Sequence, residues 1–219
     1  MKPLVLAIDT THECGSLALA RGDEILEELA LRAPHGFAHV IYSHLSGLLD
    51  RHNFRPADID CFASASGPGS FTGVRVGLAC VKGLAEASGK TAVAVSNLQA
   101  LAAFGAGPLR AAVLDARRGE VYGGVYDSAG ALVAPEMVAK FSAWLETLPP
   151  GVEFVSQDYQ PELRGTRFDG AAITTAPHAL AGAIARIAYA RFLRGEASDP
   201  AALDANYVRR SDAELFWKE

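Results

Sequence analysis

The chain has 219 residues, of which 50% are hydrophobic and 21% charged, and its formal net charge is −5. This composition suits a folded protein with a sizeable core and argues against a disordered chain. A negative charge without a basic stripe excludes a protein that binds nucleic acid by itself through a basic surface. No apolar run approaches the ~18 residues of a membrane-spanning helix, so we expect a cytoplasmic protein with no membrane contact.

Cysteine usage agrees with this location. The three cysteines, Cys14, Cys61 and Cys80, are an odd number and include no CxxC pair. Neither a disulfide framework nor a zinc site has this pattern. We therefore predict buried, reduced thiols.

The first half of the chain begins with a three-stranded meander. Its strands are predicted at residues 3–9, 15–21 and 24–31, where short apolar runs end at polar turns. Alternating helices and strands follow, because the apolar spacing changes to that of an amphipathic helix. These elements are a helix over 38–51, a strand over 59–65, a helix over 72–88 and a strand over 91–95.

The second half opens on the same pattern after a linker, Gly105–Pro108. A second meander is predicted with strands at 110–115, 120–126 and 131–133. After it, residues 140–175 read as irregular, and residues 179–194 read as an alanine-rich helix.

The two meanders predict a duplicated fold, because Asp9 and Asp115 each end the first strand of their copy. A repeat of this kind predicts an α/β protein of two βββαβα lobes, as in the actin, Hsp70 and sugar-kinase (ASKHA) superfamily, with the second lobe shortened. We place the domains at 1–104 and 109–219. Two unrelated meanders in an ordinary α/β protein are the alternative.

The segment Gly67–Arg75, GPGSFTGVR, joins a predicted strand to a predicted helix. Pro68 fixes one backbone angle, Gly67 and Gly69 permit positive φ, and Ser70 suits the helix N-cap. Such a turn can offer backbone amides to an anion near a helix N-terminus. A structural turn that lets two helices approach explains the same residues.

Five strings occur in order along the chain: AIDTT, SGPGSFTGVRVGLACVKGLA, VSNLQALA, LDARRGEVYGGVYD and YVRRSDAE. Together they resemble the TsaB (YeaZ) family, bacterial proteins of threonylcarbamoyladenosine tRNA modification. The resemblance implies an actin-like fold. It also implies two partners: the longer paralogue TsaD, which transfers the threonylcarbamoyl group to the adenosine next to the anticodon, and the small ATPase TsaE.

The resemblance further implies a non-catalytic protein that TsaD requires, which reaches tRNA only through the complex. In TsaD an HxxxH pair binds the catalytic metal. The matching positions here are Asn97 and Leu101, and neither replaces an imidazole. We expect no metal and no cofactor, with ATP or ADP at a partner junction left open. The alternative is a stand-alone ATP-dependent transferase or kinase, or a metallopeptidase.

His35 and His39 form another HxxxH pair. Gly36 stands where the zinc-binding helix of a metallopeptidase has its glutamate, and Pro34 places His35 before the predicted helix. We therefore expect no metal at this pair.

One set of candidate site residues reads as a vestigial phosphate loop. Its members are Asp9, Thr10, Thr11, Gly67, Gly69 and Asp115. In active members of the superfamily, such aspartates orient a nucleotide's magnesium or a water. Aspartates that simply cap the turns after their strands are the simpler interpretation.

A second set lies along one side of the predicted helix 72–88 and is a candidate partner interface. Its members are Gly73, Val74, Gly77, Cys80, Val81 and Leu84. Glycine inside a helix costs ~1 kcal/mol against alanine, so these glycines need a packing reason. One reason is close packing on the protein's own sheet. The other, implied by the resemblance, is pairing with the equivalent helices of TsaD or, in a homodimer, of a second copy.

Overall fold

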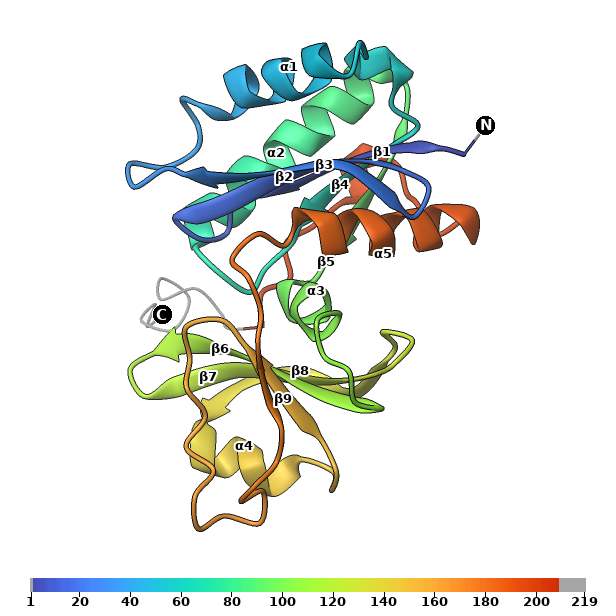
Figure 1. Cartoon of the computed structure of the whole chain (residues 1–219). Coiled ribbons are helices and arrows are strands. Elements are labelled where there is room, and N and C mark those ends of the chain that lie inside the picture. Colours follow the sequence, from blue (N-terminus) through green and yellow to red (C-terminus); the bar gives the residue numbers. More distant parts are fainter. Residues whose placement is uncertain (1, 209–219) are drawn as a thin grey trace, which may run out of the picture. The chain divides into compact units, whose positions relative to one another are not determined.

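The structure, a computed structural model, describes residues 2–208 (Figure 1). The chain divides into two compact units. Among the described residues, the first takes those up to Ala100 together with His178–Ala205, and the second takes Leu101–Pro177 and Asn206–Val208. Each unit is built on one five-stranded sheet, and the two sheets share one topology. The predicted α/β duplication is confirmed.

The sheet of the first unit has the strand order β3-β2-β1-β4-β5. Its strands are β1 (Leu4–Asp9), β2 (Cys14–Arg21), β3 (Glu24–Arg32), β4 (Cys61–Ala65) and β5 (Thr91–Val95). The meander of β1, β2 and β3 is antiparallel, whereas β4 and β5 run parallel to β1. Every residue of β1 is buried, as expected for a central strand that is covered on both faces.

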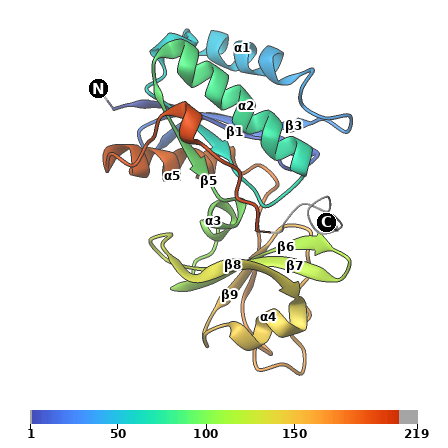
Figure 2. The same cartoon turned by 180° about the vertical axis from the view of Figure 1, so that it is seen from behind.

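Helices cover both faces of this sheet. On one face, α1 (Ile41–Arg51) and α2 (Phe71–Ser88) lie side by side, and α5 (Ala181–Leu193) lies on the opposite face (Figures 1 and 2). The core beneath α1 and α2 consists of large apolar side chains, among them Ile8, Leu17, Leu48, Phe62 and Val81. Two short helices, η1 (Pro56–Asp58) and η2 (Pro200–Ala202), also belong to this unit. A third, α3 (Asn97–Ala102), lies where the chain passes from the first unit to the second.

Helix α5 corrects the predicted domains. Residues 178–205 follow the second unit in the chain but return to the first, so the predicted second domain, 109–219, is wrong at its C-terminal end. The reason is the small-residue face of α5, which is buried and packs on β1, β2 and β4. The alanine-rich pattern predicted the helix, but it did not indicate which sheet the helix would cover.

The first turn of α5 is held by two side chains of the sheet. Ser16 Oγ accepts hydrogen bonds from the amides of Leu180 (3.1 Å) and Ala181 (2.9 Å), and a Glu28 carboxylate oxygen accepts one from the Gly182 amide (2.7 Å). The first amides of a helix have no partner within the helix. Ser16 and Glu28 therefore supply the cap that the α5 sequence lacks.

We expect Ser16→Ala to lower the free energy of unfolding by ~1–3 kcal/mol, because it leaves two buried amides without an acceptor. Thermal unfolding measures the loss, and amide exchange at Leu180 and Ala181 should accelerate. Ser43→Ala is the control, since Ser43 Oγ donates to the Val40 carbonyl but is exposed. Unchanged stability together with unchanged exchange would contradict this role of Ser16.

The sheet of the second unit repeats the order of the first, read as β8-β7-β6-β9-β10. Its strands are β6 (Leu109–Arg117), β7 (Glu120–Asp127), β8 (Leu132–Lys140), β9 (Glu153–Ser156) and β10 (Ile173–Thr175). Here β6, β7 and β8 are antiparallel, and β9 and β10 run parallel to β6. Thus β6 takes the place that β1 has in the first sheet.

Residues 140–175 are not irregular throughout, as predicted, but contain α4 (Phe141–Thr147), β9 and β10. Elements this short hold too few residues to show a period in the sequence. Trp144 of α4 packs on Gly123, where a Cβ would lie 2.2 Å from its ring. Between β9 and β10, residues 157–172 form no helix, whereas the first unit has α2 at that place. The second lobe is shortened in this sense.

None of the helices within residues 2–208 combines the length and the apolar character that a membrane crossing needs. From Arg209 onward, the terminal string YVRRSDAE lies outside the described residues.

Candidate functional site: a buried turn and the helix that covers it

The turn after β1 is buried. Asp9 and Thr10 are each 2% exposed, and Thr11 is 5% exposed. Both the amide and the hydroxyl of Thr11 donate to Asp9 Oδ1, at 2.9 Å and 2.7 Å. The turn-capping interpretation of Asp9 is confirmed.

Asn97 ties this turn to the glycine–proline loop. Its Nδ2 donates to Thr11 Oγ1 (2.7 Å), and its Oδ1 accepts from the Gly67 amide (2.9 Å). The Ser70 amide donates to the Thr11 carbonyl (2.7 Å). Two loop amides that could have faced an anion are therefore bonded within the protein. In the sequence, Asn97 is notable only because it stands where TsaD has a metal-binding histidine. Its bridging role does not follow from the sequence, because Asn97 and Thr11 are 86 residues apart in the chain.

Burial raises the pKa of the Asp9 carboxyl above its ordinary 3.8, while hydrogen bonds from Thr11 and Asn97 act in the opposite direction. A raised pKa means that ionised Asp9 is less favourable in the folded than in the unfolded chain. The stability associated with protonated Asp9 is complete below pH 3.8 and is lost as the pH rises through the folded-state pKa.

We expect Asp9→Asn to gain stability over the native chain as the pH rises from about 4 to about 8, because the neutral amide keeps an acceptor for Thr11 without a buried charge. Melting temperatures of both proteins across this range measure the difference. Asp58→Asn is a control of opposite sign, since hydrogen bonds from Arg55 lower the Asp58 pKa. A difference between Asp9→Asn and the native chain that stays constant with pH would be evidence against the buried charge.

Two glycines of α2 allow this helix to cover the turn. A Cβ on Gly73 would lie 2.0 Å from the Thr10 carbonyl oxygen, and one on Gly77 would lie 2.7 Å from Thr10 Oγ1 and 3.0 Å from Ser64 Oγ. Thr10 Oγ1 also donates to the Gly73 carbonyl at 2.7 Å. Of the two reasons considered for these glycines, close packing on the protein's own sheet is the one that the structure supports.

The predicted partner interface therefore lies inside the first unit and is wrong as a surface. Gly73 and Gly77 are buried, as are Val74, Cys80 and Val81, and Leu84 packs against the core. Five residues spaced four apart face outward instead: Phe71, Arg75, Ala79, Gly83 and Ala87. We call these five residues the α2 ridge, since side chains four apart lie along one side of a helix.

The α2 ridge has an aromatic end and a small-residue end. Phe71 is 44% exposed, and the Arg75 guanidinium lies 3.7 Å from its ring centroid. No atom lies within 4 Å of the place where a Cβ would stand on Gly83. Beside the ridge, Tyr42 of α1 is 60% exposed and its hydroxyl is hydrogen-bonded to Cys80 of α2. Unlike Gly73 and Gly77, Gly83 has no packing reason within the described chain.

The remaining candidate residues have structural roles. Asp115 caps its own turn in the second unit, where its Oδ1 accepts from the Arg117 amide (2.8 Å), but it is exposed. The three cysteines are free thiols; Cys61 and Cys80 are buried, as predicted, while Cys14 is partly exposed. Burial raises the pKa of Cys61 to about 12 and that of Cys80 to about 11, so both thiols stay protonated at neutral pH.

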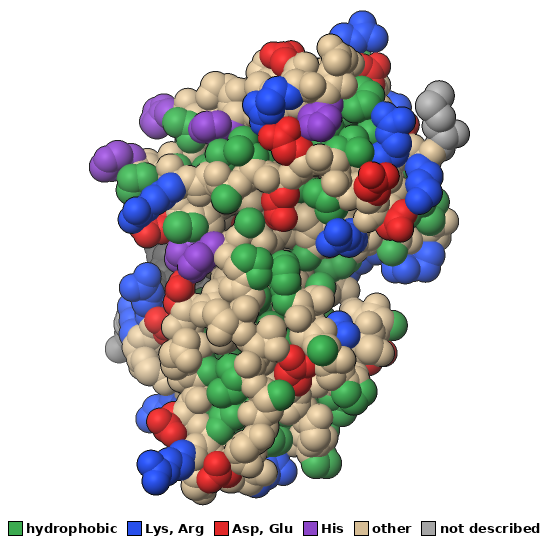
Figure 3. Space-filling view, viewed as in Figure 1, with side chains coloured by type: hydrophobic (Ala, Val, Ile, Leu, Met, Phe, Trp, Pro, Cys, Tyr) green, Lys and Arg blue, Asp and Glu red, His purple; other side chains and the backbone are tan. Residues whose placement is uncertain are grey.

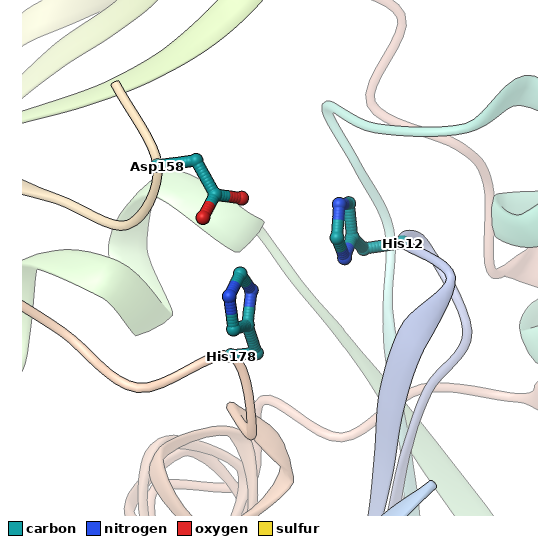
Figure 4. A group of neighbouring side chains, drawn as sticks. All are labelled: His12, Asp158 and His178. Atoms are coloured by element: carbon teal, nitrogen blue, oxygen red, sulfur yellow. The ribbon is translucent and has the colours of Figure 1, made fainter. Parts of the chain in front are cut away.

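His35 lies before the helix, as predicted. His35 and His39 are exposed and precede α1, so they share no helical face, and within residues 2–208 they join no group of three potential metal ligands. Figure 4 shows His12 and His178 of the first unit, whose rings stack with centroids 5.2 Å apart. Two imidazoles are fewer ligands than a zinc site uses. Asp158, also labelled there, belongs to the second unit.

Comparisons with known proteins agree with this fold. The family model of TsaD, described as tRNA N6-adenosine threonylcarbamoyltransferase, matches residues 32–189. The "tRNA threonylcarbamoyladenosine biosynthesis protein TsaB" of Bacillus subtilis is 33% identical over 98% of both chains, and the Escherichia coli protein of that name is 35% identical over 56% of this chain and 54% of its own.

Solved structures show the same relationship. YeaZ from Pseudomonas aeruginosa superimposes with a TM-score of 0.76 at 25% identity, over 94% of this chain and 99% of that one. Component A of the (R)-2-hydroxyglutaryl-CoA dehydratase of Acidaminococcus fermentans, with a TM-score of 0.52 at 11% identity over 87% and 99% of the two chains, shares the fold alone. The fold is that of the actin-like, TsaD-related proteins. Within that class, the chain belongs to the TsaB family.

Proposed function

We propose that this chain is a non-catalytic component in the synthesis of threonylcarbamoyladenosine in tRNA, and that it acts by binding a TsaD-type partner. The names of its full-length relatives support the pathway. The observation that carries the non-catalytic role is the internal bonding of the glycine–proline loop, whose Gly67 and Ser70 amides are bonded to Asn97 and Thr11. Leu101, fully buried, stands where the resemblance to TsaD would require a metal ligand.

The proposed partner surface is the α2 ridge together with Tyr42 of α1. Large exposed aromatic side chains are typical anchors of protein interfaces. The small residues Ala79 and Gly83 allow a partner helix to approach closely. The family resemblance implies helix pairing with TsaD, and the same ridge would pair two copies of the isolated chain.

Gly83→Leu should weaken association with the TsaD-type partner ~5- to 150-fold, because a larger side chain forces packed helices apart. The melting temperature of this variant should stay equal or rise, since leucine favours a helix more than glycine does. Affinity by isothermal titration, thermal unfolding and a tRNA modification assay together measure the effect.

Gly77→Leu is the matched control on the buried side of α2. It should lose ~2–3 kcal/mol of stability or more, because its side chain would overlap Thr10 and Ser64. Normal partner affinity in Gly83→Leu would remove the α2 ridge from the interface.

Titration of ATP and metal analysis on the isolated chain test the catalytic alternatives: stoichiometric metal or micromolar ATP binding would favour an enzyme.

The isolated chain should not bind tRNA measurably at ~150 mM salt, because its net charge is −5 and nucleic-acid binding depends on cationic contacts to phosphates. Acidic and basic side chains are interspersed over the face in Figure 3. A gel shift at low micromolar protein would contradict this expectation.

We further propose a TsaE-type ATPase as a third component and a cytoplasmic location. We propose no resident cofactor for the isolated chain. Titration of the assembled complex with ATP and ADP tests whether a nucleotide binds at a partner junction.

A further inference from the structure

One buried side chain holds the loop that leads into α2. Asn97, the first residue of α3, is 2% exposed and bonds both polar backbone groups of Gly67. Its amide donates to the Gly67 carbonyl (2.8 Å), and its Oδ1 accepts from the Gly67 amide (2.9 Å). Glycine has the widest backbone freedom of all residues, and Gly67 uses it, with φ of +100°. Asn97 therefore restrains a residue that would otherwise let the loop move.

The same side chain also holds the turn after β1. Asn97 Nδ2 donates to Thr11 Oγ1 (2.7 Å), and the Thr11 hydroxyl donates in turn to Asp9 Oδ1 (2.7 Å). Because the hydroxyl proton is used on Asp9, Thr11 Oγ1 needs a donor from Asn97, whereas the Gly67 amide needs an acceptor. Asparagine offers one donor group and one acceptor group on a short side chain. Alanine, leucine or an ionised aspartate would leave at least one of these needs unmet.

The turn passes this restraint on to the first turn of α2. The Thr11 carbonyl accepts from the Ser70 amide (2.7 Å). Ser70 is the N-cap of α2, where its Oγ accepts from the Gly73 amide (3.2 Å). Thr10 Oγ1 in addition donates to the Gly73 carbonyl (2.7 Å). Since the first amides of a helix have no partner within it, these contacts decide how firmly the first turn is held.

The aromatic end of the α2 ridge begins at this point. Phe71 directly follows Ser70, is 44% exposed, and has the Arg75 guanidinium 3.7 Å from its ring centroid. An exposed side chain that is already ordered binds a partner more tightly, because less conformational entropy is lost on association. Two hydrogen bonds, from Asn97 to Thr11 and from Ser70 to Thr11, connect the buried side chain to the residue before Phe71.

We propose that Asn97 is a positioning residue for the partner surface. It is buried, so it acts without touching the partner, by keeping the first turn of α2 and Phe71 in the conformation that binds. The inference rests on the proposed function, in which the α2 ridge contacts a TsaD-type protein. It goes further because it assigns part of the partner affinity to a side chain inside the protein.

Asn97→Ala should weaken association with the TsaD-type partner by about tenfold, because the freed turn must be ordered on binding. Its melting temperature should fall by about 3–8 °C, since the Gly67 amide loses its acceptor. Ser16→Ala is the matched control. It removes the acceptor of two buried amides that hold α5 on the opposite face of the sheet, and should lose similar stability with unchanged affinity. Titration calorimetry below both melting temperatures measures the affinities.

A double-mutant cycle with Phe71→Ala distinguishes positioning from a general loss of stability. If Asn97 acts through Phe71, then Asn97→Ala should weaken association by about twofold or less in the Phe71→Ala background, instead of about tenfold. The same cycle made with Ser16→Ala should show no coupling. A merely structural role of Asn97 would give additive effects.

Amide hydrogen exchange reports the conformation of the loop without the partner. In Asn97→Ala, exchange of the Gly67 and Ser70 amides should accelerate more than that of the Lys90 amide, which is hydrogen-bonded just beyond the other end of α2. Thr11→Val keeps Asn97 and a branched side chain at position 11, but removes the hydroxyl between them. It should show the same changes in exchange and affinity, so the test does not depend on the folding of Asn97→Ala.

Native affinity in a folded Asn97→Ala or Thr11→Val would overturn the inference. So would an equal loss of affinity in Ser16→Ala, or additive effects in the cycle with Phe71→Ala. If the native chain fails to associate with a TsaD-type partner, or Phe71→Ala binds as the native chain does, the proposed function or its surface fails, and this inference with it. If Phe71→Ala binds weakly while Asn97→Ala binds normally, only the positioning role is excluded.

Discussion

The close approach of α2 to the turn after β1 is the constraint on which the first unit depends. A Cβ on Gly73 would overlap the Thr10 carbonyl oxygen, and a Cβ on Gly77 would be too close to the Thr10 hydroxyl. No other residue type fits without moving the helix or the turn. This contact fixes the rotation of α2 about its axis. The side with Val74 and Val81 then enters the core, and the α2 ridge, on the other side, faces outward.

The same contact has an electrostatic consequence. Once α2 covers the turn, the polar groups of Asp9, Thr10 and Thr11 lose water and need partners inside the protein. Asn97 supplies a donor and an acceptor at once, and it joins the turn to Gly67. The buried carboxylate costs stability, which is seen as the raised pKa of Asp9. Two amides of a loop that could bind an external anion, those of Gly67 and Ser70, are thereby bonded within the protein.

The sequence predicted what depends on neighbours along the chain and missed what depends on neighbours in space. The strands of the first meander, the α2 boundaries and the repeat of the meander followed from apolar spacing and from turn residues. The third strand of the second meander was predicted too short, at 131–133, because β8 continues to Lys140 through half-buried residues that show no clear alternation. The glycines of α2 were recognised as needing a packing reason, but periodicity does not indicate whether a helix face meets its own sheet or another protein. The return of α5 to the first sheet, the bridge made by Asn97 and the short elements β9 and β10 are likewise set by tertiary contacts. Gly83 could have been distinguished from Gly73 and Gly77, because it falls on the polar side of the helical period.

The presence of a helix between β4 and β5, and of none between β9 and β10, explains why the two units differ in what they expose. Both sheets have one topology, and both place an aspartate at or near the end of the first strand, where its carboxylate accepts from the amide two residues on. In the first unit, α2 connects β4 to β5 and buries that turn. In the second unit, the connection from β9 to β10 has no helix, so the corresponding turn stays at the surface. A buried turn is selected for small polar residues that satisfy one another, as Thr10 and Thr11 do. An exposed turn is free of that demand, because water can satisfy its polar groups.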